Sequence, residues 1–124
     1  MPRLEDVLAD LAAQPHVRAA ALAGFDGLLV DEAFHGSGPD RSPALDGAVV
    51  ELTQAWNGVR RACAEYLDGR AARELVVVAD GGMLLTHVVA HAWFVLLWAA
   101  PEVDAERGRA ALREAAELLA EVVT

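Results

Sequence analysis

The chain has 124 residues with a formal net charge of −9, and 55% of them are hydrophobic. That length suits one domain, and that apolar fraction is too high for a disordered chain. The excess of 19 acidic over 10 basic residues argues against binding to nucleic acid or to an anionic membrane, because both surfaces are negative. The longest apolar run, residues 92–101, is about half the length of a membrane-spanning helix. We therefore predict one domain over residues 1–124 that does not insert into a membrane.

The residue types also indicate the cellular setting. Cys63 is the only cysteine, so no disulfide can form within the chain, which fits a reducing compartment. The first six residues turn acidic at once, which does not fit a signal peptide. Every basic residue is arginine, and the chain lacks lysine and isoleucine, a usage that indicates a GC-rich bacterial genome. We expect a cytoplasmic bacterial protein.

Residues 4–14 predict a short amphipathic helix that ends before Pro15. Its apolar residues recur at steps of three and four, and they are Leu4, Val7, Leu8 and Leu11. Apolar stretches at 17–23 and 28–34 flank a turn that contains Asp26 and Gly27. Because this pair tolerates positive φ, the two stretches predict a β-hairpin. Residues 35–43 are rich in glycine and proline and predict a loop.

Residues 43–67 predict the longest helix, with Ser42 as its N-cap and Pro43 in its first turn. One apolar stripe recurs at alternating steps of four and three, and we expect it to pack on the chain's own sheet. Its members are Leu45, Val49, Leu52, Trp56, Val59, Cys63 and Tyr66. A second line holds Ala48, Ala55 and Ala62 at seven-residue spacing. Because small residues let another backbone approach closely, this line packs either on the same sheet or on the helix of a second copy.

Residues 74–79, 83–89 and 92–99 predict three strands joined by tight turns, so neighbouring strands are antiparallel. The stretch 92–99 is apolar on both faces, which indicates a central strand whose Trp93, Phe94 and Trp98 lie in the core. A last helix follows Pro101. The fold class is therefore α/β (α+β), a five-stranded antiparallel sheet between helices in the order α-β-β-α-β-β-β-α.

No residue pattern predicts a catalytic, cofactor-binding or metal site. His87 and His91 have the four-residue spacing of zinc ligands on a helix, but here they fall on a strand and its turn, about 13 Å apart. We expect His87 on a sheet face and His91 in a turn. Cys63 lies on the apolar stripe of the long helix, so we expect a buried, inert thiol instead of a nucleophile.

Three residues of the long helix are candidates for contacting a partner. Trp56 lies in the middle of the apolar stripe, where a core position is the default, yet tryptophan is also a favoured interface anchor. Arg60 and Arg61 are either a solvated pair or the one concentrated basic spot that could meet a carboxylate of a partner.

The order of elements and the first hairpin together resemble the roadblock / dynein light chain domain family, of the bacterial GTPase-regulator type seen in gliding motility. The residues that carry the resemblance span nearly the whole chain. They are Pro15, Val17, Arg18, Gly24, Asp26, Gly27 and Leu28, then 74–77, Gly81, Gly82, Leu84, Leu85 and Pro101. The chain departs from the family in its longer loop at 36–39 and in His91, where members often carry glycine.

The resemblance implies a protein without chemistry of its own that forms a homodimer or pairs with a paralogue. Family dimers join a sheet edge and the long second helix across a two-fold axis. The matching positions here are Glu74, Val76 and Val78 on the edge strand, with Ala48, Glu51, Ala55 and Ala62 on the helix. Bacterial members partner small Ras-like GTPases, which makes such a GTPase the expected partner.

Two other functions stay open from the sequence. A small-molecule sensor of PAS- or GAF-like type would need a cavity over the sheet, where Trp93, Phe94 and Trp98 are expected to fill the space. A small hydrolase or transferase would need a nucleophile–base pair, and the chain offers no convincing one.

Overall fold

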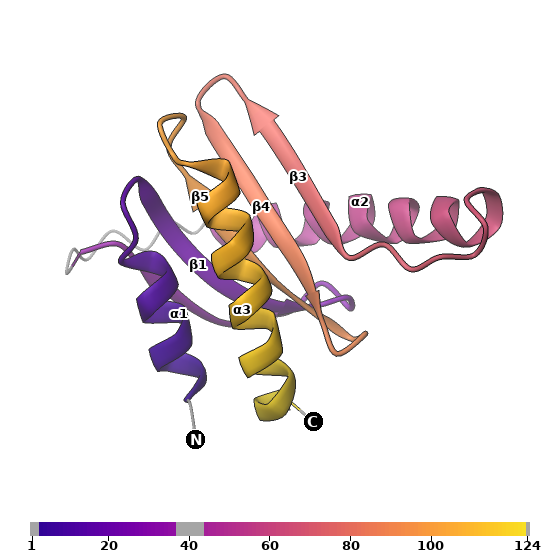
Figure 1. The fold of residues 1–124 in the computed structure, drawn as a ribbon, viewed down its shortest axis with the longest axis horizontal. Coiled ribbons are helices and arrows are strands. Elements are labelled where there is room, and N and C mark those ends of the chain that lie inside the picture. Colours follow the sequence, from indigo (N-terminus) through magenta and orange to yellow (C-terminus); the bar gives the residue numbers. More distant parts are fainter. Residues whose placement is uncertain (1–2, 37–43, 124) are drawn as a thin grey trace.

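The computed structural model describes residues 3–36 and 44–123 and has three layers, with helices on both faces of one sheet (Figure 1). The elements are α1 (Leu4–Ala12), β1 (Val17–Gly24), β2 (Leu29–Phe34), α2 (Ala44–Tyr66), β3 (Glu74–Ala79), β4 (Gly82–Val89), β5 (Trp93–Ala99) and α3 (Ala105–Val123). The predicted element order is confirmed. The predicted cap at Ser42 and Pro43, and most of the loop 35–43, lie outside the described residues.

The five strands form one antiparallel sheet in the order β2-β1-β5-β4-β3. β5 is central, as its two apolar faces predicted, and its four residues 94–97 are buried. Ala90 and His91 join β4 to β5 with φ of 48° and 71°. Two consecutive positive φ values suit a tight hairpin turn, although neither residue is the glycine or asparagine that adopts them most easily.

The first helical layer consists of α1 and α3, which lie side by side in front of the sheet in Figure 1. The apolar stripe of α1 buries Val7, Leu8 and Leu11 against one face of β1 and β2. α3 buries Leu112 and Leu119 in the same cluster, over β4 and β5. Both helices carry acidic residues in their first turn, where the positive end of the helix dipole favours them.

Among the described elements, α2 alone covers the opposite face, and its first half lies on the sheet. Leu45, Val49, Leu52 and Trp56 are buried in a second core cluster with β5. The later part of α2 projects past β3 (Figure 1), and from Arg61 to Tyr66 only Cys63 is even partly buried.

Four residues that were predicted to lie in the core are not fully buried. Tyr66 is 79% exposed and Cys63 is half-buried, because the stripe to which they belong continues after the sheet has ended. Trp93 and Trp98 are half-buried, since each lies near an end of β5, whereas Phe94 is fully buried.

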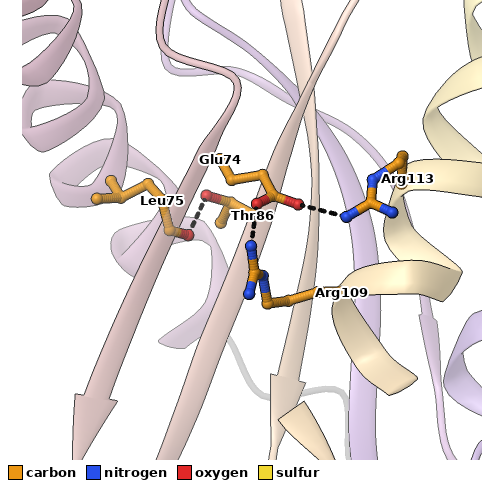
Figure 2. A network of polar contacts seen from close by, with 5 residues as sticks. All are labelled: Glu74, Leu75, Thr86, Arg109 and Arg113. Carbon is orange, nitrogen blue, oxygen red and sulfur yellow. Dashed lines mark hydrogen bonds and ion pairs between the residues drawn. The ribbon is translucent and has the colours of Figure 1, made fainter. Parts of the chain in front are cut away.

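Trp56 anchors α2 to the sheet. Its ring lies 5.7 Å from that of Phe25 and 6.5 Å from that of Phe94, centre to centre. Its indole Nε1–H donates a hydrogen bond of 3.0 Å to the hydroxyl of Thr86. That hydroxyl in turn donates a hydrogen bond of 2.7 Å to the carbonyl of Leu75, as Figure 2 shows. The buried indole N–H is thus satisfied through a chain that links α2, β4 and β3.

Thr86→Val tests this anchor. The substitution leaves a buried indole N–H without an acceptor, so we expect a loss of about 1–3 kcal/mol in the free energy of unfolding, measured by urea denaturation at a fixed protein concentration. Thr53→Val is the matched control, because the Thr53 hydroxyl is equally buried but only bonds the Val49 carbonyl of its own helix. Equal losses in the two variants would contradict the anchoring role.

Candidate interaction surface

The small residues of α2 form one flank of the helix that faces the β3 side of the sheet. Ala48, Glu51, Ala55 and Ala62 are all exposed. Ala48 and Val77 of β3 line the same groove, so this flank of the helix faces β3. Gly58 lies on the same flank, and a Cβ atom built there would meet nothing within 4 Å. The three- and four-residue steps from Ala55 to Gly58 to Ala62 would have revealed this glycine in the sequence.

β3 is an edge strand, and valines make up much of its free surface. Val76, Val77 and Val78 are 39%, 40% and 72% exposed. Leu75 packs in the α2 cluster, so by alternation Val77 points to the α2 side of the sheet and its two neighbours to the α3 side. An exposed apolar edge with unpaired backbone groups is a template for pairing with another strand.

A groove of about 260 Å³ lies between the start of α2 and the β3–β4 hairpin. Its lining comes from the helix, the hairpin and β5, namely Leu45, Ala48, Val77, Ala79, Gly81, Gly82, Met83, Leu84 and Trp98. Among these described lining residues, only Trp98 has a side-chain group with a strong hydrogen-bonding capacity, its indole N–H. Trp98 was expected to fill the space above the sheet and instead lines an open part of it.

The other flank of α2 carries Arg60, whereas Arg61 lies on the outer side of the helix, and both differ from Trp56. Trp56 has no exposed surface. It therefore occupies the core position that was one of its two interpretations, and a direct contact with a partner does not fit this structure. The Arg60 guanidinium lies 4.1 Å from the centre of the Phe25 ring and donates a hydrogen bond of 3.3 Å to the His91 carbonyl. Arg60 therefore connects α2 to the turns of the β1–β2 and β4–β5 hairpins. Arg61 is exposed.

Glu74, at the start of β3, is part of an ion-pair network with α3 (Figure 2). Its carboxylate accepts a hydrogen bond of 2.7 Å from Arg109 and lies 3.7 Å from Arg113. The hydrogen bond from Arg109 lowers the pKa of Glu74 below 4.5, and the positive charges nearby add to this, while partial burial opposes it. Glu74 thus ties the edge strand to α3, a role that the sequence did not indicate.

No family model and no curated protein matches the chain. Solved structures do match it. A roadblock/LC7 domain from Streptomyces avermitilis gives a TM-score of 0.83 at 22% identity, covering 98% of each chain. The gliding protein MglB from Thermus thermophilus also gives 0.83, at 18% identity over 95% of this chain and 86% of that one. The chain has the roadblock fold.

MglC from Myxococcus xanthus has the same architecture, with a TM-score of 0.65 at 24% identity over 94% of this chain and 96% of that one. At these identities the likeness establishes the fold. The resemblance to roadblock domains that the sequence predicted is thereby confirmed as a fold assignment.

The two histidines that were considered as metal ligands lie in different environments. His87 is half-buried on β4, opposite Glu74, and His91 is exposed in the β4–β5 turn. Within residues 3–36 and 44–123, no three His, Cys, Asp or Glu side chains gather closely enough to hold a metal ion. Among the helices of the same described part, none is both long and apolar enough to cross a membrane.

Glu74→Gln tests the β3–α3 network. Because the pKa of Glu74 is lowered in the folded state, its ion pairs stabilise the fold above pH 4.5, and this stabilisation is lost as the pH falls through the lower, folded-state pKa. We expect the variant to have a lower urea midpoint than the wild type at pH 7, with the difference shrinking below pH 4.5. Glu102→Gln, at an exposed position outside the network, should shift the midpoint little at either pH. A pH-independent difference for Glu74→Gln would contradict this role.

Proposed function

We propose that the protein is a non-catalytic regulator or scaffold that pairs with a second copy or a paralogue and binds a small Ras-like GTPase in the bacterial cytoplasm. The observation that carries the proposal is the apolar surface formed by the β3 edge, the adjacent groove and the small-residue flank of α2. This surface is continuous, since Ala48 and Val77 line the same groove. A lone domain gains nothing by exposing it to water.

Pairing of two copies would cover this surface in one step. Two β3 edges can pair antiparallel about a two-fold axis, which makes the same patch meet itself. The second half of α2 projects past β3, so a sheet added at that edge lies beneath it (Figure 1). Tyr66 and Leu67, which are exposed in one copy, would then gain apolar cover from the other. The interface residues are those predicted from the sequence, with Gly58 added and Glu74 at its margin.

The proposed GTPase contact uses the two arginines of α2, which lie outside the row of alanines. Pairing through the alanine flank leaves Arg61 exposed, and Arg60 is held rigidly beside it by Phe25. In a chain of net charge −9, this pair offers a carboxylate-binding spot to a partner. The choice of a small Ras-like GTPase rests on the resemblance to bacterial roadblock regulators, and the likeness of the fold to MglB supports it.

The sensor alternative is less well supported. Small-molecule pockets typically enclose about 300–1,000 Å³ and fix their ligand with a few convergent polar groups. The groove beside α2 measures about 260 Å³ and offers a single indole N–H. It suits apolar side chains of a protein better than a small ligand.

Ala55→Arg tests the pairing. The substitution places a long charged side chain in the middle of the small-residue flank, so we expect the dimer to dissociate to monomer in sedimentation velocity experiments at micromolar concentration. Asn57→Arg is the matched control, because it adds the same side chain two residues away, at an exposed position of the same helix that lies off the small-residue flank. A fully dimeric Ala55→Arg variant would show that the helix flank is not the interface.

The GTPase partner is tested by capture from native lysate on the immobilised protein, in the presence of GDP or of a non-hydrolysable GTP analogue. We expect mass spectrometry to identify a small GTPase that is retained in one nucleotide state, and Arg61→Glu to reduce its capture at least tenfold. Arg107→Glu makes the same charge change at an exposed position of α3 and should leave capture of the GTPase unchanged. A stable dimer that retains no small GTPase in either state would contradict the proposed partner, and single-turnover hydrolysis would distinguish an activator from a tether.

A further inference from the structure

A second groove lies between α1 and α3. These two helices cover the other side of the sheet, as Figure 1 shows. It measures about 220 Å³, and its floor is apolar, with Val7 and Leu11 from α1 facing Ala111, Ala115 and Leu118 from α3. The proposed dimer surface lies on the α2 face and along β3, so pairing leaves this groove open. No sequence pattern pointed to it, because its depth depends on the spacing of two helices that are far apart in the chain.

The apolar surface continues along α3 beyond the groove. Leu118 is 40% exposed and Val122, one turn further on, is 37% exposed. Helix α1 has nine residues and α3 has 19, so α1 covers only part of its neighbour. The result is an apolar track on α3 that no described residue covers fully.

Carboxylates line both sides of this track. Asp10 on α1 and Glu114 on α3 lie in the rim of the groove itself, together with the amide of Gln14. Exposed neighbours extend the acidic rim along both helices, and they are Asp6, Glu117 and Glu121. Within the described part of the chain, none of these five carboxylates takes part in an ion pair.

The arginines of α3 do not neutralise the rim. Arg109 and Arg113 turn toward the sheet edge, where they meet Glu74 at 2.7 Å and 3.7 Å. Arg107 lies one turn before the groove and is not among its lining residues. The charge of the rim is therefore free to act on a partner, with an effective range of about 8 Å at physiological salt.

We propose that the α1–α3 groove docks a basic amphipathic helix of another protein. Two neighbouring helices form a groove into which a third helix can lay its apolar side chains at i, i+3, i+4 and i+7. Arginine or lysine residues on both flanks of that helix meet Asp10 on one rim and Glu114 on the other. The volume is below that of typical small-molecule pockets but admits the anchoring side chains of such a helix.

The test uses a fluorescein-labelled synthetic peptide of about 18 residues, long enough to form a helix, with leucines at i, i+3, i+4 and i+7 and arginines at the flanking positions. Anisotropy titrations at physiological salt compare the wild type with Asp10→Asn/Glu114→Gln and with Leu118→Ser. We expect each variant to weaken binding about tenfold, because the first removes both rim charges and the second removes an apolar anchor. Asp80→Asn/Glu102→Gln, which removes two exposed charges elsewhere, should change binding less than twofold.

The outcomes distinguish specific binding of the peptide in this groove from nonspecific attraction of a basic peptide to an acidic protein. Equal weakening by the control double variant, or equal binding of a peptide with the same composition in scrambled order, would overturn the proposal. Species larger than a dimer that disappear in Asp10→Asn/Glu114→Gln would assign the groove to a further copy of this chain and would also overturn it. The Ala55→Arg variant should bind the peptide like the wild type, so this test does not depend on the proposed dimer. Because Leu118 is partly exposed, the variants should retain the wild-type melting temperature.

Discussion

The burial of Trp56 determines how α2 lies on the sheet, and the candidate interaction surface depends on that position. The indole is fully buried against Phe25 and Phe94, and its N–H donates a hydrogen bond to the hydroxyl of Thr86. An unsatisfied indole in this core would be costly, so α2 is held at its middle and cannot slide to cover more of the sheet. Its first half therefore covers the core, while its second half projects beyond β3.

This placement leaves the molecule with two open surfaces of opposite character. Along the β3 edge and on the α2 side of the sheet, the exposed valines and the groove beside α2 are almost purely apolar, which suits burial against an identical or related copy. On the other face, the α1–α3 track combines an apolar floor with unpaired carboxylates, which suits a basic partner. In the proposed function, one surface would be covered by a second copy while the other stays open to a different protein.

The fold was predictable because its signals are local. Asp26–Gly27 specified a hairpin, the alternation of apolar residues specified the strands, and a stretch apolar on both faces placed β5 at the centre. Burial was less predictable, since periodicity shows which residues share a face but not where the opposing surface ends. That is why Cys63 and Tyr66 were assigned to the core and are not buried there. The Glu74–Arg109 pair and the α1–α3 groove join residues distant in sequence, so no local pattern could reveal them.

The most direct test of the account is amide hydrogen exchange of the wild-type protein, measured by mass spectrometry over a range of protein concentrations. If the β3 edge and the alanine flank of α2 are covered by a second copy, peptides spanning 74–79 and 48–62 should exchange more slowly as the concentration rises, while the β2 edge should not change. Fast exchange of residues 74–79 at every concentration, with the 13.1 kDa mass of a single chain in solution, would contradict the account.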